Sequence, residues 1–200
     1  MTRSTSTPRI RVLQVYYGLL LAAVAVCEPL YGPSSTGRVL ELAGLLLVAL
    51  AALGRIWTTL HIAGHKDERV VTAGPYARCR HPLYAFNIVG SVGLGLATRS
   101  MVLTLVTACV SLALHFGALV REERNLQATL GATYRDYAAR VSRLCPRSAH
   151  AEAPATLAIS PAICWKAFLD AGSLLALYVA LELIATGRDA GLWRTLVNVY

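Results

Sequence analysis

The stretch LYAFNIVGSVGLGLATRSMVLTLVTACVSLALHFGALV, residues 83–120, decides the fold of this chain. It holds two apolar runs, Leu83–Thr98 and Met101–Val120, and neither contains Asp, Glu, Lys or Arg. A helix needs about 20 apolar residues to cross the hydrocarbon core of a bilayer, so the second run is long enough and the first is short. Because only Arg99 and Ser100 separate the runs, we predict two antiparallel membrane helices in a tight hairpin.

The first of these runs is rich in small residues, which are Gly90, Ser91, Gly93, Gly95 and Ala97. Small side chains allow membrane helices to approach closely, so this run is predicted to pack against neighbouring helices. The glycines do not form a phosphate-binding loop, because they lie inside an apolar run with no strand before them.

The composition extends the membrane interpretation to the whole chain. Of 200 residues, 56% are hydrophobic and only 15% are charged, which is too apolar for an ordinary soluble domain. Three further candidate spans are Val12–Cys27, Val39–His61 and Ala167–Thr186. We therefore predict an all-α, multi-pass membrane helix bundle of about five transmembrane helices. Residues 1–200 form a single integral-membrane domain, and residues 157–200 add a C-terminal membrane helix region, which either shapes a lipid entrance or completes the bundle.

The first span has two interpretations. Arg3, Arg9 and Arg11 precede it, as in a signal peptide, but no small-x-small cleavage site leads to a polar mature start. We interpret the span as a retained helix.

Basic residues predict the orientation. They gather before the first span, between the second and third, and between the fourth and fifth, whereas the alternate side carries only Arg38, Arg99, Arg188 and Arg194. Cytoplasmic loops carry such an excess, so the N-terminus and both long loops are expected in the cytoplasm, at a bacterial cytoplasmic membrane. The net charge of +8 is then explained by loops facing anionic lipid. No nucleic-acid motif is present, and no nucleic-acid partner is predicted.

The five cysteines are isolated, and no C-x-x-C pair occurs. A quinone-linked membrane thiol oxidoreductase uses such a pair as its reaction centre, so the sequence argues against that function. The cysteines are therefore interpreted as core or incidental thiols.

The segment GPYARCRHPLY, Gly74–Tyr84, precedes the first helix of the hairpin. Pro82 suits the first turn of a helix, so Arg80 and His81 are expected at the boundary between water and lipid. Ionisable groups are costly there, which makes them candidates for function.

A second polar segment, Arg121–Leu126, follows the hairpin. At 100° per residue, one apolar stripe forms from Leu119, Leu126, Leu130, Tyr134, Tyr137 and Val141. Glu122 and Glu123 flank this stripe, whereas Arg124 and Arg135 lie nearly opposite. The pattern predicts two carboxylates on the packed side of the helix; the alternative is a solvated acidic face.

Three other polar residues are open to two interpretations. Arg55, inside an apolar run, either pairs with an acid at a wet cavity or extends its guanidinium to the interface. His61 and His65 have the spacing of a metal pair, but Gly64 weakens the helix and no third ligand follows, so we predict a polar cap and no metal site. His115 is interpreted as a core or interhelical hydrogen-bonding residue.

These segments together resemble the isoprenylcysteine carboxyl methyltransferase family of integral-membrane enzymes. The resemblance rests on Gly74-Pro75-Tyr76-x-x-x-Arg80-His81-Pro82-x-Tyr84, Glu122-Glu123-x-x-Leu126, Leu130-Gly131-x-x-Tyr134-x-x-Tyr137 and Val141-x-Arg143-x-x-Pro146. It covers residues 55–146, which would form the methyltransferase core. The family often has phenylalanine in place of Leu130 and proline in place of Ser142, and we interpret both as packing changes.

The resemblance implies S-adenosylmethionine as the methyl donor, held in a cytoplasmic-side pocket. The residues implied for cofactor binding are Gly74, Tyr76, Arg80, His81, Tyr84, Glu122, Glu123 and Tyr134. Carboxylates would accept hydrogen bonds from the ribose or amino group, and aromatic faces would suit the sulfonium.

The predicted partners are membrane lipid and a lipophilic or amphipathic acceptor. A carboxylate acceptor, such as an isoprenylcysteine, is already ionised at neutral pH and would need only orientation, for which Arg55 is the predicted cation. An amine or thiol acceptor would need deprotonation, with Glu123 or His81 as the base. A non-catalytic membrane scaffold is the alternative from another class, and a small transporter is disfavoured because no repeated half is present. The oligomeric state stays open.

Overall fold

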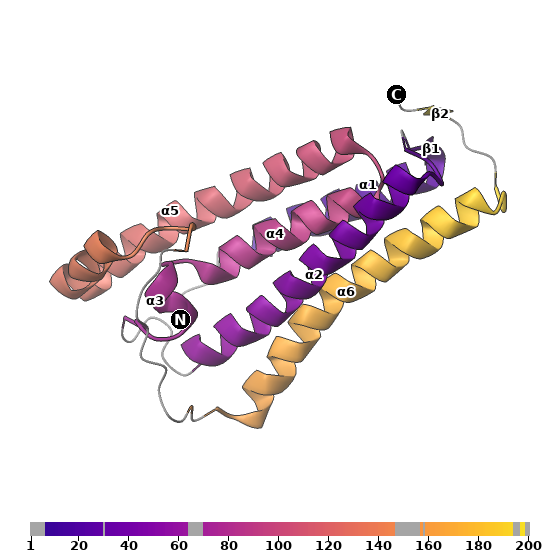
Figure 1. Ribbon diagram of the computed structural model, residues 1–200. Helices are drawn as coiled ribbons and strands as arrows, with labels where there is room; N and C mark the ends of the chain where they lie inside the picture. The colour runs from indigo at the N-terminus through magenta and orange to yellow at the C-terminus, as the bar shows by residue number, and fades with distance from the viewer. Residues whose placement is uncertain are drawn as a thin grey trace.

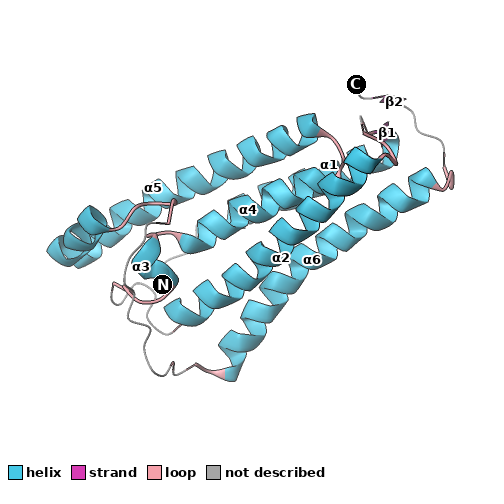
Figure 2. Ribbon diagram, in the orientation of Figure 1, coloured by secondary structure: helices cyan, strands magenta, loops and turns pink. Residues whose placement is uncertain are grey.

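The computed structural model describes residues 7–29, 31–63, 70–146, 157, 159–193 and 197–198. Its elements are α1 (Thr7–Val26), β1 (Cys27–Glu28), α2 (Ser35–Ile62), α3 (Pro75–Arg78), α4 (Pro82–Ala97), α5 (Met101–Arg140), α6 (Pro161–Asp189) and β2 (Val197–Asn198). Figure 2 shows helices running through nearly all of the chain. The predicted all-α bundle is confirmed, with one small addition. The two-residue strands β1 and β2 pair in parallel, a contact that no sequence pattern indicated.

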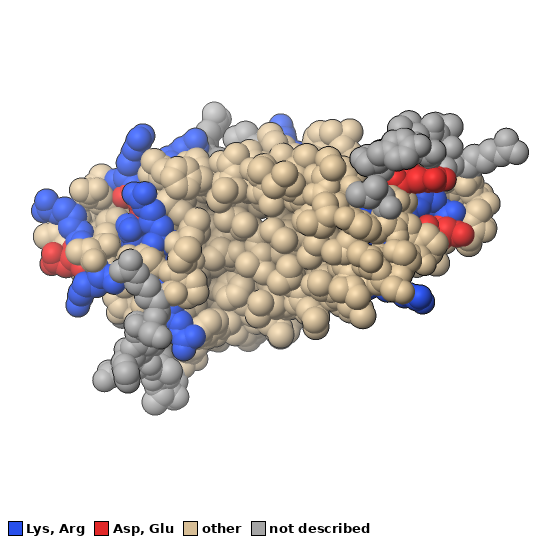
Figure 3. Space-filling model, turned by 45° about the horizontal axis from the view of Figure 1, so that its top comes forward, with Lys and Arg blue, Asp and Glu red and all other residues tan. Residues whose placement is uncertain are grey.

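Membrane helices make up most of the bundle. Among the described residues, α2, α5 and α6 are long and apolar enough to cross a membrane, while Ile10–Val26 and Pro82–Ala97 form shorter apolar helices. Figure 3 shows charged side chains at the two ends and a broad uncharged band between them. Such a band is the surface that a bilayer requires, because lipid offers no partner for charges.

The closest helix packing joins α2 to α4, and glycine makes it possible. A Cβ atom at Gly44 would lie 2.7 Å from the Gly93 carbonyl oxygen, and one at Gly93 would lie 2.7 Å from the Gly44 carbonyl oxygen. Real Cβ atoms do not approach so near, so any larger residue at either position would push the helices apart. The predicted role of the small residues in helix packing is confirmed.

The turn between α4 and α5 is as short as predicted. Thr98, Arg99 and Ser100 form it, and the Ser100 hydroxyl caps α5 by accepting a hydrogen bond from the Leu103 amide at 3.4 Å. Arg99 adopts a φ of 56°, in the left-handed region that side chains rarely occupy. The turn therefore depends on contacts that hold Arg99 in place.

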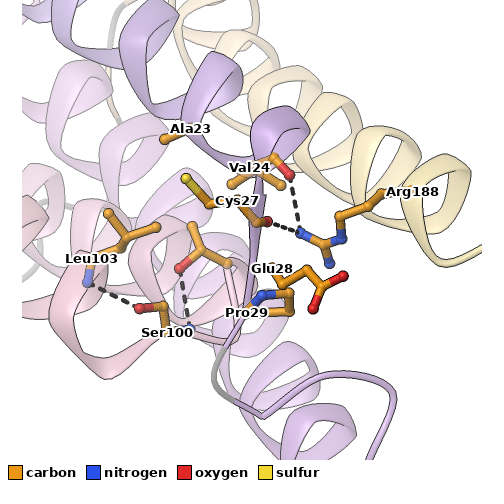
Figure 4. A pocket seen from close by; sticks show the side chains of 9 residues that line it. Ala23, Val24, Cys27, Glu28, Pro29, Ser100, Leu103 and Arg188 are labelled. Atoms are coloured by element: carbon orange, nitrogen blue, oxygen red, sulfur yellow. Dashed lines mark hydrogen bonds between the residues drawn. The ribbon is translucent and has the colours of Figure 1, made fainter. Parts of the chain in front are cut away.

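Those contacts form a cluster of charges, which we call the turn-end network, made of Glu41, Arg99, Arg188 and Asp189. The Arg99 guanidinium binds Glu41 of α2 and donates to Asp189 Oδ2 of α6 at 2.5 Å. Arg188 donates to Asp189 Oδ1 and also to the Val24 and Cys27 carbonyl oxygens, at 3.0 and 3.1 Å. Figure 4 shows Arg188 reaching toward the end of α1, beside a pocket lined partly by Ser100 and Leu103. The network ties the turn to α1, α2 and α6.

The apolar core lies among α1, α2, α4 and α6. It consists of Leu20, Val24, Val48, Ala51, Leu94, Ala97, Leu174, Tyr178, Leu181 and Ala185. The last helix is longer than the predicted span, because Ser160 caps its start and the helix continues to Asp189.

α5 extends beyond the other helices at the end where α3 lies (Figure 1). Gly131 interrupts its helical geometry with a φ of 53° and a ψ of −121°. The chain after the helix then returns to the loop between α3 and α4, where the Ser142 carbonyl accepts from the Arg80 amide at 2.8 Å and the Arg143 carbonyl accepts from the His81 amide at 3.1 Å. This return brings the two polar segments of the sequence together.

Candidate functional site

A sharp bend in the backbone presents the loop before α4. Gly74 has a φ of 58° and a ψ of −127°, and a Cβ atom there would lie 2.3 Å from the His61 ring. Only glycine fits both the bend and the neighbouring ring. The amides of Tyr76 and Ala77 are bonded within the turn, to the carbonyls of Ala73 and Gly74. Gly74 therefore has a structural reason to be present, whatever else it contacts.

Tyr76 and Tyr137 lock this loop onto α5. The Tyr137 hydroxyl donates to the Tyr76 carbonyl oxygen at 2.7 Å, and both side chains are buried. Burial raises the pKa of the Tyr76 phenol, and the nearby Glu122 carboxylate raises it further. Tyr76 thus stays a neutral phenol in the wall of the site.

The two polar segments meet in a cluster of charges, which we call the site-end cluster: Arg80, His81, Glu122, Glu123 and Arg143. Arg80 Nη1 donates to Glu123 Oε1 at 2.6 Å, and His81 Nε2 lies 3.3 Å from the same oxygen. Arg143 donates to Glu123 Oε2 at 3.1 Å. The Glu123 side chain is only 12% exposed, so its charge depends on these partners. The predicted packed position of Glu122 and Glu123 is confirmed.

Glu122 has different partners. The Tyr84 hydroxyl donates to Glu122 Oε2 at 2.8 Å, and His81 Nδ1 lies 4.0 Å from that oxygen. No hydrogen bond or ion pair joins Glu122 to an arginine within the described ranges. The Tyr84 ring is stacked on the His81 ring, with centroids 5.7 Å apart, and lies 5.5 Å from the His115 ring. The Glu122 carboxylate therefore lies next to the packed rings of Tyr84 and His81.

Burial lowers the pKa of His81, although Glu122 and Glu123 act in the opposite direction. The His81 side chain is 5% exposed. The ring is therefore neutral at neutral pH, with its Nε2–H directed at Glu123. A neutral imidazole at this place can donate one hydrogen bond and accept another.

Arg80 retains unused hydrogen-bonding capacity. Its guanidinium lies beside the buried Tyr134 phenol, but its Nε–H is buried and has no acceptor among the described residues. A buried donor without a partner is costly. Arg80 is therefore suited to receive an additional acceptor, such as a carboxylate from a ligand.

The structure does not bring Arg55 into the site-end cluster. No hydrogen bond or ion pair in the described part of the chain joins it to Glu122 or Glu123; it instead interacts electrostatically with Asp170 of α6 and Tyr17 of α1. Its predicted role in orienting an acceptor stays a prediction.

The proposed histidine cap is only partly visible. His61 Nδ1 lies 2.8 Å from the Trp57 carbonyl oxygen, whereas His65 lies outside the described residues. Among the described residues, no group of three or more His, Cys, Asp or Glu side chains is placed to hold a metal ion.

Sequence reasoning missed two polar residues near the site. Arg143 was part of a quoted motif, but nothing in its spacing showed that it would reach Glu123. Asn87 was not singled out, although it follows Tyr84 by one helical turn; its Nδ2 lies 3.2 Å from His115 Nε2. The signal for Asn87 was a lone amide in an apolar helix. The predicted interhelical hydrogen bond of His115 is present.

Comparison with known proteins identifies the chain's relatives. It is 32% identical over 191 residues to the cobalt-zinc-cadmium resistance protein CzcN of Cupriavidus metallidurans, an alignment covering 96% of this chain and 88% of that protein. It is 31% identical over 182 residues to the nickel-cobalt-cadmium resistance protein NccN of Alcaligenes xylosoxydans xylosoxydans, covering 91% and 85%. No solved structure matches the chain.

A profile of the isoprenylcysteine carboxyl methyltransferase (ICMT) family matches residues 36–128. The matched part contains nearly all of α2, the bend at Gly74, the whole of α4 and the part of α5 that carries Glu122 and Glu123. Together with the site-end cluster, this match shows that the chain belongs to the isoprenylcysteine carboxyl methyltransferase family.

Proposed function

We propose that this protein is an S-adenosylmethionine-dependent methyltransferase that modifies a lipophilic or amphipathic acceptor within the membrane. The observation that carries the proposal is the meeting of Arg80, His81 and Tyr84 with Glu122 and Glu123 at one end of a membrane bundle. Membership of the family supports the same activity.

The residues fit the polar groups of the proposed cofactor. The unpaired Nε–H of Arg80 suits the carboxylate of the amino-acid part of S-adenosylmethionine. Glu122, which no described arginine neutralises, suits the ribose hydroxyls or the ammonium group. The stacked rings of His81 and Tyr84 offer aromatic faces near these polar groups, where a sulfonium is stabilised. S-adenosylmethionine supplies a methyl group activated by a positively charged sulfur.

The protein would contribute to the reaction by positioning the cofactor and the acceptor and by excluding water from the site. Methyl transfer is an in-line displacement, so much of its rate comes from holding the reacting atoms in line. Glu123 fixes Arg80 and His81 on one side, while Tyr84 fixes Glu122 on the other. The hydrogen bond from Tyr137 to the Tyr76 carbonyl keeps the loop closed over α5.

We also propose that the site-end cluster lies on the cytoplasmic side. Lys and Arg side chains gather at this end of the molecule (Figure 3), as expected of a cytoplasmic surface. The acceptor would keep its apolar tail between helices or in lipid and bring its polar end to this boundary. The names of the relatives refer to metal resistance, and we place no metal in the site.

The test is methyl transfer from labelled S-adenosylmethionine. Purified protein in vesicles made from bacterial membrane lipids should place the label in a lipid-soluble product, which mass spectrometry then identifies. Glu123→Gln should reduce the label at least 100-fold, because it removes the charge that holds Arg80 and His81. Arg124→Gln is the matched control, since Arg124 is the next residue on the same helix and is exposed.

Two results would contradict the proposal. One is wild-type protein that neither binds S-adenosylmethionine nor labels any product, as expected of a scaffold. The other is equal labelling by wild type and Glu123→Gln, which would place the chemistry elsewhere.

A further inference from the structure

A hydrogen-bonded pair lies next to the proposed cofactor site, inside the membrane part of the bundle. Asn87 of α4 and His115 of α5 join through Asn87 Nδ2 and His115 Nε2, at 3.2 Å. His115 is 4% exposed. Tyr84 links the pair to the site-end cluster, because its hydroxyl binds Glu122 and its ring centroid lies 5.5 Å from that of His115. The pair therefore adjoins the site-end cluster from the membrane side.

The hydrogen bonds of His115 fix the direction of this pair. His115 Nδ1 lies 2.7 Å from the Ser111 carbonyl oxygen, which can only accept, so Nδ1 carries the proton. Nε2 then accepts from the Asn87 amide nitrogen. The Asn87 side chain is thus oriented with its Nδ2 toward His115 and its Oδ1 away from it.

This orientation leaves a strong acceptor unused. Asn87 Oδ1 is buried and has no hydrogen-bond donor among the described residues. A buried carbonyl oxygen without a donor destabilises the protein, and a ligand that supplies a donor removes this penalty. The Asn87 amide nitrogen serves His115 and the Asn87 main-chain carbonyl accepts from the Ser91 hydroxyl, so Oδ1 is the atom of this residue that the described part of the chain leaves without a partner.

The charges around the pair also select the ligand. Arg80 and Arg143 both bind Glu123, and Arg55 interacts with Asp170. No hydrogen bond joins a lysine or arginine of the described part of the chain to Asn87, although Arg55 of α2 has a buried Nε–H without an acceptor there. A carboxylate would bring its negative charge next to the Asn87 carbonyl oxygen, with no partner, whereas an N–H group would find an acceptor.

We propose that the Asn87–His115 pair binds the methyl acceptor and that this acceptor is an amphipathic amine. The inference rests on the proposed methyltransferase function and names its substrate class. A neutral amine donates one N–H to Asn87 Oδ1 and keeps its lone pair for the methyl carbon. The apolar surroundings favour the neutral form over the ammonium.

The reaction balances without a base in the transfer step. The amine lone pair forms the nitrogen–carbon bond, and the carbon–sulfur bond breaks with its electrons remaining on sulfur. The positive charge passes from the sulfonium to the alkylammonium product, which releases its proton to water afterwards. A hydroxyl acceptor would instead need a base beside Asn87, and His115 Nε2 is already occupied by the amide.

The test compares three acceptors that share one chain: oleylamine, oleyl alcohol and oleic acid, each in phosphatidylcholine vesicles with the reconstituted protein. We expect methylation of oleylamine well above the other two. Asn87→Leu and His115→Phe should each lower kcat/KM for oleylamine at least tenfold while the Kd for S-adenosylmethionine changes less than twofold. Thr107→Val is the matched control: it removes a buried polar group of α5 that binds Tyr16 of α1, and it should keep both values.

The outcomes separate this inference from the function on which it rests. Preferential methylation of oleic acid or oleyl alcohol would overturn it, as would oleylamine methylation that Asn87→Leu leaves unchanged. So would protein that binds S-adenosylmethionine and methylates none of the three, because all three chains satisfy the membrane requirement. Wild-type protein that fails to bind S-adenosylmethionine would overturn the proposed function instead. If Asn87→Leu fails to fold, His115→Phe decides the matter.

Discussion

The two ends of the bundle both hold ion pairs, but they use them differently. In the turn-end network, Arg99 binds the carboxylates of Glu41 and Asp189. Arg188 binds the Val24 and Cys27 carbonyl oxygens at the end of α1. In the site-end cluster, Glu123 binds both arginines, while Glu122 accepts a hydrogen bond from the Tyr84 hydroxyl and lies 4.0 Å from His81. The arginines of the turn-end network join helices, although Glu182, which interacts electrostatically with Glu41, Arg99 and Asp189, has a buried Oε1 without a hydrogen-bond partner among the described residues. At the site end, the described residues leave Glu122 without an arginine partner and the Arg80 Nε–H without an acceptor.

This difference separates stability from function. A network that ties four elements together should matter for the free energy of unfolding. A cluster with unused hydrogen-bonding capacity should matter for ligand binding. Variants at the turn end should therefore change stability more than ligand binding, and variants at the site end should do the reverse.

The largest effect is expected from Glu123→Gln. It leaves the Arg80 side chain, which is 14% exposed, without its carboxylate partner, and it weakens the contact with His81. Methyl transfer should fall at least 100-fold, equivalent to about 3 kcal/mol of transition-state stabilisation. Activity that falls less than fivefold would show that the cluster is structural, like the other end.

Arg99→Gln should mainly lower stability. Arg99 is 5% exposed, and the substitution keeps its side-chain stem but removes the guanidinium that bridges Glu41 and Asp189. Breaking a buried pair costs about 3 kcal/mol, so the melting temperature in detergent should fall by several degrees, while the Kd for S-adenosylmethionine stays unchanged. Arg124→Gln, on an exposed surface, should change neither value. A weaker Kd with an unchanged melting temperature would reverse the assignment of the two ends.

A smaller effect concerns pH and His81. Burial lowers the pKa of the folded-state imidazole, while Glu122 and Glu123 oppose the shift and Arg80 adds to it. The unfolded chain, with a histidine pKa of about 6.5, then binds more protons than the folded chain just below that pH. The contribution of the neutral His81 ring to the free energy of unfolding is complete above pH 6.5 and is lost as the pH falls below that value. Wild type should therefore lose more thermal stability between pH 7.5 and 5.5 than His81→Gln does; equal losses would contradict the buried, neutral ring.

The smallest effect is chemical reactivity. Burial raises the pKa of the Cys79 thiol to about 11, so little thiolate exists at pH 8. Cys145 is exposed on the returning segment. A water-soluble maleimide at pH 8 should label Cys145 much faster than Cys79, as peptide mass spectrometry would show. Rapid labelling of Cys79 would mean that the loop before α4 opens readily.

Much of the fold was accessible to sequence analysis because it depends on local patterns. The uncharged runs on either side of Arg99 predicted the hairpin, and the stripe from Leu119 to Val141 predicted which face of α5 carries its glutamates. The spacing of small residues predicted the close approach of α4 to another helix. These features follow from periodicity and from the cost of charges in lipid.

Other features depend on contacts between distant residues, which no local pattern encodes. The electrostatic interaction of Arg55 with Asp170 depends on how α6 packs against α2. The contact of Arg143 with Glu123 depends on the path of the chain after Gly131. The hydrogen bond that orients Asn87 comes from a histidine on the neighbouring helix. For the same reason, the sequence left the acceptor open between a carboxylate oriented by Arg55 and an amine or thiol, whereas the structure leads us to propose an amine beside Asn87.

The most direct test of the central claim is calorimetric titration of S-adenosylmethionine into the protein in lipid nanodiscs. Three proteins suffice: wild type, Glu122→Gln at the site end and Glu41→Gln at the turn end. We predict one site per chain in wild type, binding at least tenfold weaker in Glu122→Gln, and unchanged affinity in Glu41→Gln. Absence of binding to wild type, or equal affinities for Glu122→Gln and wild type, would contradict the assignment of the site-end cluster as the cofactor site.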